Sequence, residues 1–396
     1  MAKFLLFTPG PVNVAANVRL AIATKDICHR EVEFDGLLAS IERKLLSLLQ
    51  IRNPKDYRAV VITGSGTAAN EAMLSSVVGN GSILILSNGE FGERLHKTSV
   101  VHNKNTHLIE FPWGHALDLA AIEAYLKLHT VSVIAVVHHE TSSGMLNPLA
   151  AIGALAKQHG AIFIVDGVSS VGAEAVDMEA DNIAFCSSSS SKAIGSYAGL
   201  SFVIGRTAQF EKLKHHRAKT TYLNLATFYD FLITRCQTPN TPGVPLFFAL
   251  ERALSNILQE GVSNRLAKIK KKAGLLRQGM RDLNLEFVLD EKDMCSMLTT
   301  VRLPAAMDIG NLRQELRNKS IIIYEGKGCF KGNTFQVGNI GELSKRDIAF
   351  FLRALGEALR ASNSEEADTT AVTAVPHVPV WSRLVGDLDI VEPVGV

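Results

Sequence analysis

The sequence predicts an α/β protein built on a largely parallel sheet of seven strands, with a smaller second domain. Short apolar runs alternate with helical patterns through the first half of the chain. The runs are almost continuously hydrophobic, which is typical of strands that helices cover on both faces. The composition agrees, because 47% of the 396 residues are hydrophobic and 20% are charged, as in a globular protein of one large or two unequal domains.

Seven apolar runs are the predicted strands of the large domain, at 59–62, 82–86, 106–110, 132–137, 161–165, 182–186 and 200–204. A long helical pattern from 245 to 281 then leads to a second region. That region has predicted strands near 285–289, 297–302, 320–324 and 334–338, and helices near 308–317 and 344–360. We therefore expect a smaller α+β domain there.

These elements divide the chain into an N-terminal arm (1–20), a large domain (21–260), a small C-terminal domain (261–360) and a tail (361–396). From Ser362 onward the composition turns to Ser, Glu, Thr, Ala, Val and Pro. A segment of this kind buries too little apolar surface to offset the entropy of ordering it. We expect the tail to be flexible and to lie outside the fold.

The charge balance gives no reason to expect a nucleic acid or a membrane as partner. Lys and Arg number 41 against 39 Asp and Glu, a net charge of +2, so no strong field is evident. The apolar run at the N-terminus is too short for a signal peptide, and no stretch is long enough to span a bilayer. The five cysteines are scattered without C-x-x-C spacing, which favours a cytoplasmic location over a disulfide framework or a zinc site. His138-His139-Glu140 lacks helical spacing and a third ligand, so we expect no metal.

Lys192 and Asp166 are the strongest functional signal in the chain. Lys192 ends a serine run, Cys186 to Ser191, and Asp166 closes a predicted strand. A pyridoxal phosphate (PLP) enzyme needs this pair of residues, because a lysine carries the cofactor as a Schiff base and a carboxylate keeps the pyridine nitrogen protonated. The alternative is a solvated lysine in a flexible serine loop. The position of both residues after strands favours a PLP site.

A loop of small residues follows the strand at 59–62 and runs into a predicted helix, from Thr63-Gly64-Ser65-Gly66-Thr67 to Glu71. Backbone N–H groups and the helix N-terminus can bind a phosphate there, with hydroxyls from Ser65 and Thr67. The same residues also satisfy G-x-G-x-x-A, a dinucleotide-binding pattern. The next strand ends in Ser87-Asn88 rather than in the acid that would bind a ribose. The dinucleotide alternative also leaves Lys192 and Asp166 without a role.

Three more residues follow strands in the same way and suit a flat heteroaromatic ring. Phe91 can stack on a pyridine ring, although it can also be an ordinary core residue. Thr141, in the loop after the strand at 132–137, can bond the phenolic oxygen of the cofactor, or it can simply belong to a polar turn. Val168 can pack on the ring face opposite Phe91, unless it is only part of the core.

With these residues in place, the chain resembles the class V aminotransferases of PLP fold type I. It is similar to the branch of 2-aminoethylphosphonate–pyruvate and alanine–glyoxylate transaminases. The matching segments occur in the order of the family and span residues 4 to about 360. They include Thr8-Pro9-Gly10-Pro11, His29 to Phe34, Gly64 to Glu71, Asn88 to Arg94, His139 to Gly144, Asp166 to Ser170, Ser191-Lys192, Thr241-Pro242, Ala249 to Leu254 and Phe335 to Gly341.

The resemblance implies an obligate homodimer whose active sites lie at the subunit interface. It implies that the phosphate of the cofactor is bound by Ser65, Gly66, Thr67 and Ser191, and by Thr241 of the other subunit. It further implies that the ring of the cofactor is held by Phe91, Thr141, Asp166 and Val168. Lys192 would form the Schiff base and then move the proton on the substrate carbon.

Two departures from the family pattern concern the substrate. Thr238 stands where the alanine–glyoxylate branch has a tyrosine. Gln336 stands where the transaminases have an arginine that binds the carboxylate or phosphonate of the substrate. If Gln336 faces the substrate, either another cation replaces the arginine or the substrate differs. Arg30, Lys327 and Lys331 are the candidates for that cation.

The expected function is therefore PLP-dependent transamination of a small amino compound, with a 2-aminoethylphosphonate-like or alanine-like donor and pyruvate or glyoxylate as acceptor. A repurposed PLP enzyme without a keto-acid half-reaction, such as a lyase or a carbon–carbon bond-forming enzyme, is the main alternative. A nicotinamide-dependent oxidoreductase is a distant alternative.

Overall fold

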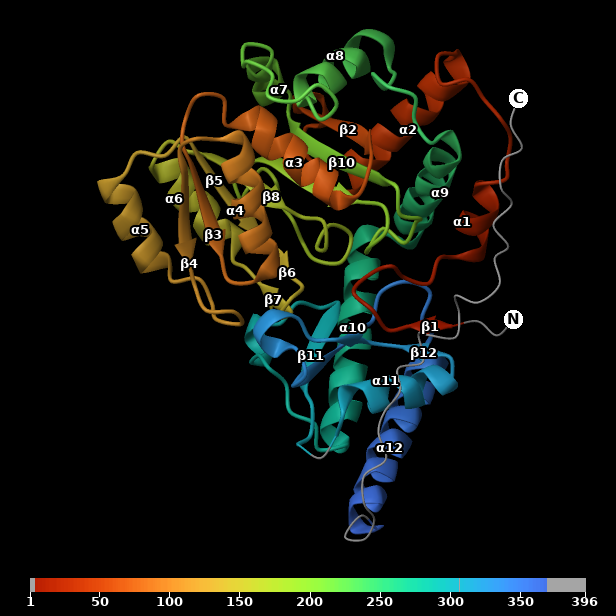
Figure 1. The fold of residues 1–396 in the computed structure, drawn as a ribbon. Coiled ribbons are helices and arrows are strands. Elements are labelled where there is room, and N and C mark those ends of the chain that lie inside the picture. Colours follow the sequence, from red (N-terminus) through yellow and green to blue (C-terminus); the bar gives the residue numbers. More distant parts are fainter. Residues whose placement is uncertain (1–3, 306, 369–396) are drawn as a thin grey trace, which may run out of the picture.

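A seven-stranded sheet forms the centre of the large domain, in the order β2–β10–β9–β8–β5–β3–β4 (Figure 1). In this computed structural model residues 4–305 and 307–368 are described. The strands are β2 (Tyr57–Thr63), β3 (Ile83–Ser87), β4 (Thr106–Glu110), β5 (Val133–Val137), β8 (Ile162–Asp166), β9 (Ile183–Ser189) and β10 (Leu200–Arg206). Each coincides with one of the predicted apolar runs. The predicted α/β class with a mostly parallel seven-stranded sheet is confirmed.

The sheet is parallel except at one strand. β10 runs antiparallel to both of its neighbours, β2 and β9. β9 continues to Ser189, beyond its predicted end at Cys186, because the first serines of the run pair with β10. Part of the serine run is therefore a buried strand and not a loop.

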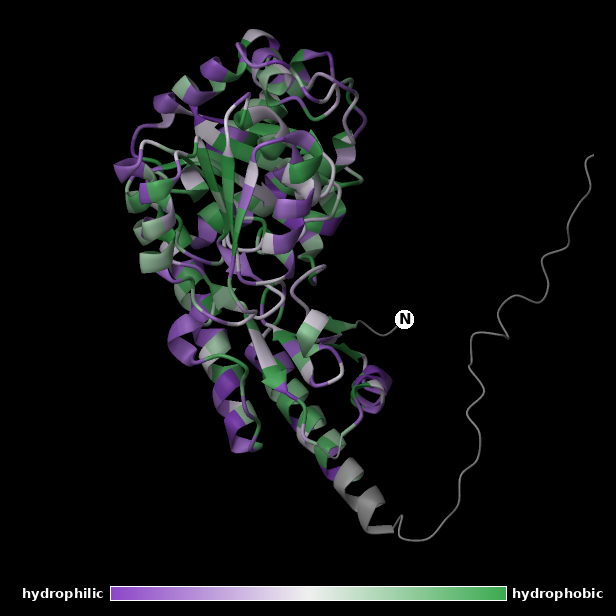
Figure 2. Cartoon of the chain, turned by 60° about the vertical axis from the view of Figure 1, so that its left-hand side comes forward, coloured by the Kyte–Doolittle hydropathy of each residue, from purple (hydrophilic) through white to green (hydrophobic). Residues whose placement is uncertain are grey.

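Helices cover both faces of the sheet, which explains why β3 and β5 are buried along their whole length. The strands are hydrophobic at the centre of the domain, and hydrophilic residues lie on the outer parts of the helices (Figure 2). The helices of this domain are α1 (Ala16–Ala21), α2 (Val32–Leu48), α3 (Gly66–Val77), α4 (Glu90–His102), α5 (Leu119–Leu128), α6 (Leu149–Gln158), α7 (Thr207–Leu213), α8 (Leu225–Arg235) and α9 (Val244–Glu260). A short hairpin of β6 (His139–Glu140) and β7 (Met145–Leu146) follows β5.

The predicted helical stretch from 245 to 281 is two helices. Gly261, with φ of +85°, ends α9 and precedes α10 (Val262–Asp282). A positive φ is easily adopted only by glycine, so the chain breaks there and α10 starts in a new direction. This break falls at the predicted boundary between the two domains.

The small domain has a three-stranded antiparallel sheet of β11 (Leu298–Arg302), β14 (Thr334–Gly338) and β13 (Tyr324–Glu325). Its helices are α10, α11 (Ile309–Asn318) and α12 (Lys345–Asp368). The strand predicted near 285–289 is wrong, because only an isolated bridge joins Phe287 to Val301. The strand predicted near 320–324 is divided, since β12 (Ile321–Ile322) leaves this sheet to pair with β1 (Leu5–Leu6).

The start of the N-terminal arm belongs to the core of the small domain. β1 runs parallel to β12, and the Phe7 ring stacks on Phe351 with ring centroids 4.4 Å apart. At the other end, α12 extends to Asp368, past the predicted start of the tail at 361. The rest of the predicted tail, 369–396, lies outside the described residues. Within the described ranges, no helix is both long enough and apolar enough to cross a bilayer.

Candidate active site

A pocket lies where β5 and β8 end and α3 and α4 begin, with about 480 Å³ of space free of protein atoms, including the solvent at its mouth. Open α/β sheets bind ligands at this edge, beyond the carboxyl ends of their strands. Six of the residues singled out from the sequence line the pocket together: Gly66, Thr67, Phe91, Asp166, Val168 and Lys192. Ser65 and Ser191 are the chain neighbours of two of them.

Asp166 is the last residue of β8 and is 5% exposed. Its carboxylate accepts hydrogen bonds from Asn70 Nδ2 at 2.6 Å and from the backbone N–H of Val168 at 2.9 Å. Burial raises the pKa of Asp166 above its usual value, while these hydrogen bonds and Lys192 oppose that shift. A positive charge in the pocket would therefore be strongly stabilised by this carboxylate.

Asn70 is a site residue to which the sequence analysis gave no role. Its Oδ1 accepts a hydrogen bond from the Ser187 hydroxyl at 2.5 Å, which fixes the amide that donates to Asp166. Asn70 lies one helical turn after Gly66, on the face of α3 that begins at the pocket. The i, i+4 spacing within the small-residue loop was the available signal.

Lys192 also lines the pocket and is half-buried. Burial lowers the pKa of its amine to about 8, and the positive charges of Lys327 and Arg94 lower it further. The negative charge of Asp166 partly opposes this shift by raising the pKa. The N-terminal arm covers this side chain. A Cβ added at Gly10, where φ is +138°, would lie 2.5 Å from Lys192 Cδ.

The N-terminus of α3 faces the pocket and is suited to an anion. Ser65 is the N-cap residue, and its hydroxyl caps no backbone N–H. The side chains of Ser65 and Thr67 are exposed. Gly66 is needed for close packing, since a Cβ there would lie 2.6 Å from Val168 Cγ1. Helix N–H groups and two free hydroxyls are the donors that a phosphate requires.

Phe91 is the second residue of α4, and the Glu140 carboxylate accepts its backbone N–H. The Glu140 carboxylate is fully buried and accepts the N–H groups of Phe91 at 3.1 Å and Gly92 at 3.0 Å, together with the Ser142 hydroxyl at 2.5 Å. A carboxylate at a helix N-terminus is stabilised by the unpaired N–H groups and the helix dipole. No local pattern in the sequence indicates this role, because Glu140 is far in the chain from the helix that it caps.

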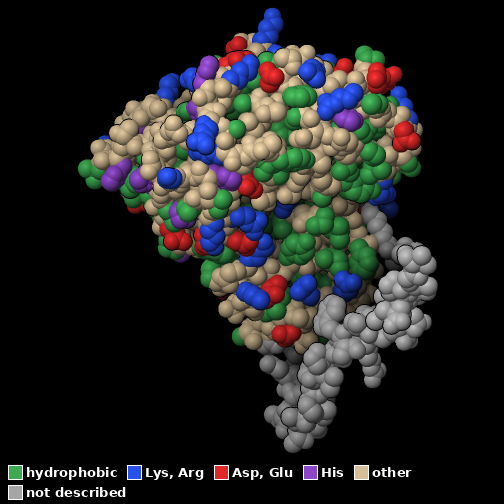
Figure 3. Space-filling model, turned by 45° about the horizontal axis from the view of Figure 1, so that its top comes forward, with side chains coloured by type: hydrophobic (Ala, Val, Ile, Leu, Met, Phe, Trp, Pro, Cys, Tyr) green, Lys and Arg blue, Asp and Glu red, His purple; other side chains and the backbone are tan. Residues whose placement is uncertain are grey.

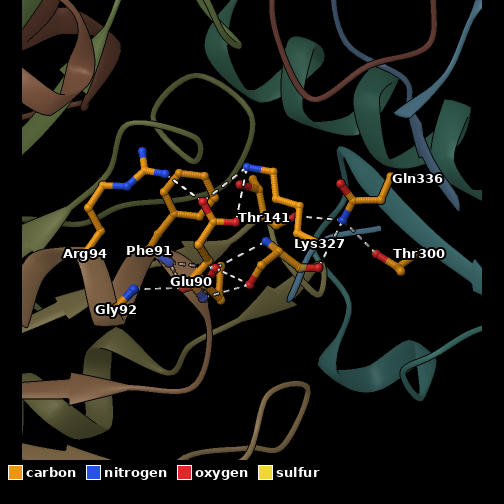
Figure 4. A network of polar contacts seen from close by, with 10 residues as sticks. Glu90, Phe91, Gly92, Arg94, Thr141, Thr300, Lys327 and Gln336 are labelled. Carbon is orange, nitrogen blue, oxygen red and sulfur yellow. Dashed lines mark hydrogen bonds and ion pairs between the residues drawn. The ribbon is translucent and has the colours of Figure 1, made fainter. Parts of the chain in front are cut away.

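Gln336, on β14, is fully buried and turned toward the loop after β6. Its Nε2 donates to the carbonyl oxygens of Thr141 at 2.7 Å and Ser142 at 3.1 Å, and lies 3.2 Å from Thr300 Oγ1 (Figure 4). Within the described part of the chain, Gln336 Oε1 has no hydrogen-bond partner. Gln336 thus joins the small domain to the loop that carries Thr141.

Arg30 and Thr241 do not line the pocket of their own chain. Arg30 is exposed and donates to the carbonyl oxygens of Thr238 at 2.7 Å and Pro239 at 3.0 Å. Thr241 is exposed just before α9. Arg30 thus holds the segment that precedes Thr241, and neither residue lines the pocket with Lys192.

His138 and His139 are two buried histidines at the end of β5. Burial lowers the pKa values of His138 and His139 to about 3, so both rings are neutral. In residues 4–305 and 307–368, no group of three or more His, Cys, Asp or Glu side chains is arranged to hold a metal ion.

The sequence and the fold were compared with known proteins, and both match aminotransferases. The model of the family "Aminotransferase class-V" matches residues 20–362. A 2-aminoethylphosphonate–pyruvate transaminase of Klebsiella pneumoniae is 33% identical over 370 residues, covering 90% of this chain and 98% of that protein. An uncharacterized aminotransferase of Methanocaldococcus jannaschii is 30% identical over 362 residues, with 90% and 93% covered.

Two solved structures are also similar. The alanine–glyoxylate aminotransferase of a Nostoc species has a TM-score of 0.86 at 28% identity, with 91% of this chain and 96% of that chain covered. The pyridoxamine–pyruvate aminotransferase of Mesorhizobium loti has a TM-score of 0.85 at 26% identity, with 91% and 93% covered.

Proposed function

Because this chain belongs to the class V aminotransferases, which are PLP-dependent transferases, we propose that it transfers the amino group of a small amino compound to pyruvate or glyoxylate. One observation carries the proposal. A buried carboxylate, Asp166, and an amine of lowered pKa, Lys192, line one pocket at the N-terminus of α3. The family assignment overturns the nicotinamide-dependent alternative, which also has no use for these two residues.

The residues of the pocket fit PLP. Gly66 and Val168 leave a close-packed wall on one side, and Phe91 offers a flat aromatic face. Asp166 suits a protonated pyridine nitrogen, and Ser65, Gly66, Thr67 and Ser191 suit the phosphate. Thr141 is the proposed partner of the phenolic oxygen. When bound to Lys192 through a Schiff base, PLP supplies an electron sink for the bond at the substrate carbon.

Lys192 is the proposed acid and base of the reaction. An amine with a pKa of about 8 exists in both protonation states near neutral pH, so Nζ can take a proton from the substrate carbon and return it. Asp166 supports this chemistry by holding a positive charge at the ring nitrogen, and Asn70 keeps the carboxylate in place.

We also propose a homodimer in a cytoplasmic setting, with each active site completed by the other subunit. Thr241 is exposed and lies outside the pocket of its own chain. In this arrangement Thr241 reaches the phosphate in the other subunit, and Arg30 supports the segment before it through its bonds to Thr238 and Pro239.

One observation favours a second candidate function. Gln336 is neutral and bonds to backbone oxygens, so it does not provide the positive charge that an arginine would give a keto acid. A PLP-dependent lyase or carbon–carbon bond-forming enzyme does not need to bind a keto acid. The two functions differ in their requirement for a second substrate.

The test is to incubate the PLP-loaded protein with 2-aminoethylphosphonate, with and without pyruvate, and with alanine, with and without glyoxylate. We expect sustained turnover only when a keto acid is present, with one amino group transferred for each aldehyde or keto product. The visible absorption spectrum should change with the amine and recover with the keto acid. Sustained product formation without a keto acid would refute transamination in favour of the second candidate.

A further inference from the structure

The hydrogen bonds of Gln336 leave it unable to bind an anion. An amide nitrogen has two hydrogens, and Nε2 already lies within bonding distance of the Thr141 and Ser142 carbonyl oxygens and of Thr300 Oγ1. The two carbonyl oxygens can only accept, so the amide is oriented with its nitrogen toward them. Its remaining polar atom, Oε1, is an acceptor and would repel an anion. A positive charge for an anionic substrate must therefore come from another residue.

Lys327 lies on a loop whose backbone is fixed by close packing. A Cβ at Gly328, where φ is +49°, would overlap the indole of Trp113, and a Cβ at Gly326 would overlap Thr334. Trp113 is itself held to α4, because its Nε1 donates to Glu93 Oε1 at 2.7 Å. The loop is thus anchored on the helix that carries Phe91.

The amine of Lys327 reaches the aromatic wall of the pocket (Figure 4). Its Nζ lies 4.9 Å from the centre of the Phe91 ring and 3.3 Å from Glu90 Oε2. Arg94 Nη2 lies 2.6 Å from Glu90 Oε1. The Glu90 carboxylate therefore pairs with two cations, and its contact with Arg94 is shorter than its contact with Lys327.

The positive charge of Lys327 also helps to lower the pKa of the Lys192 amine, after the larger effect of burial. It is the largest electrostatic contribution to the lowered pKa of Lys192, and Arg94 acts in the same direction. The side chain of Lys327 is 37% exposed, so its contact with Glu90 is accessible to water and weak. Lys192, Lys327 and Arg94 are the three cations of this group, against the two carboxylates Asp166 and Glu90, so an anion bound there would meet a small excess of positive charge.

We propose that Lys327 binds the anionic group of the substrate, a phosphonate or a carboxylate, in place of the arginine that position 336 lacks. This inference rests on the proposed function. Without substrate, Glu90 holds Lys327 beside the Phe91 ring. With substrate, the long flexible stem of Lys327 moves its amine from Glu90 to the anion, and Glu90 keeps its pair with Arg94.

The test measures the binding of unreactive anions to the PLP-loaded protein by calorimetry. Ethylphosphonate and propionate carry the two candidate anionic groups but no amine. Lys327→Met removes the charge and keeps the stem, and Lys327→Arg keeps the charge. We expect Lys327→Met to weaken binding of the preferred anion about ten-fold or more, and Lys327→Arg to retain it within a few-fold. Glu90→Gln should tighten it, because it frees Lys327.

Lys292→Met is the matched control, since Lys292 is an exposed lysine elsewhere on the small domain. It should leave anion binding and turnover unchanged. With the amine donor, Lys327→Met should raise KM much more than it lowers kcat, as expected for the loss of a binding contact.

The outcomes separate this inference from the proposed function. Unchanged anion binding in Lys327→Met overturns the inference even if transamination is observed. An equal loss in Lys331→Met, or no binding of either anion to the wild type, overturns it as well. If the anion binds through Lys327 and no keto-acid-dependent turnover is found, the anion site stands and the proposed transamination fails.

Discussion

The Nε2 atom of Gln336 lies 2.7 Å from the carbonyl oxygen of Thr141, and this hydrogen bond joins the small domain to the loop that follows His139, a residue of the pocket. β14 and the loop after β6 are far apart in the chain, and Gln336 is fully buried between them. A shift of the small domain would therefore be transmitted to Thr141. Gln336 thus holds the Thr141 loop against the small domain.

Gln336→Glu should weaken both the fold and the active site. A carboxylate would place an acceptor against two carbonyl oxygens, leaving buried polar groups unpaired at a cost of about 1–3 kcal/mol. Denaturant unfolding measures this loss. Thr300→Val is the control, because it removes only the longest of the three contacts and should cost less. Equal stability of Gln336→Glu and the wild type would show that the bonds to the loop contribute little.

Gln336→Arg should change substrate preference. A guanidinium has five N–H donors, so it can keep the two carbonyl bonds and still offer donors and a charge to an anion. We expect higher kcat/KM for alanine or 2-aminoethylphosphonate than in the wild type. The kcat/KM values of the two proteins are compared over a panel of amines and keto acids. Equal values across the panel would mean that residue 336 does not act on the substrate.

Asp166→Asn should fold normally and lose most activity. The amide cannot balance a protonated pyridine nitrogen, so we expect a loss on the order of several kcal/mol in the activation barrier. Single-turnover rates with a PLP-loaded protein measure it. Asn70→Ala, which leaves the charge and removes one hydrogen bond, should cost clearly less. Near-wild-type rates in a folded Asp166→Asn protein would remove Asp166 from the reaction.

The cofactor-free protein should be stabilised when Lys192 is replaced by methionine. The folded-state pKa of Lys192 is about 8, below its usual value of 10.5, so the folded state binds this proton less tightly than the unfolded state. The charged lysine therefore destabilises the fold fully below pH 8, and the penalty disappears as the pH rises toward 10.5. Lys192→Met should gain about 1–3 kcal/mol at pH 7 and little at high pH, measured by denaturant unfolding. A difference that does not depend on pH would contradict the lowered pKa.

Mixed dimers test the role of Thr241 in the other subunit. Lys192→Ala and Thr241→Ala should each be nearly inactive, the first without the reacting amine and the second with weaker cofactor binding. In a mixed dimer, one of the two sites has both wild-type residues, so mixing should restore part of the activity. Mixing each variant with itself is the control. If the variants exchange subunits and mixing restores no activity, Thr241 does not bind the cofactor of the other subunit.

The strands of the large sheet could be predicted because parallel strands covered on both faces must be apolar along their whole length. The site residues at their ends followed from the same rule, which is why Lys192 and Asp166 line one pocket. The broad spread of charges was also visible in the sequence, and Figure 3 shows both signs scattered over one face of the molecule.

Long-range contacts could not be predicted. Nothing local in the sequence indicates that Glu140 caps α4 or that the amide of Gln336 bonds to the Thr141 loop. The absent strand near 285–289 has a similar cause, since an apolar run becomes a strand only where a neighbour offers a full ladder of hydrogen bonds.

The close approach of Gly10 to Lys192 limits which substitutions the N-terminal arm can accept. The Gly10 backbone lies against the Lys192 side chain, while Leu5 and Leu6 extend the structure of the small domain as β1. In a saturation library, position 10 should therefore tolerate little change, although it lies far along the chain from Lys192.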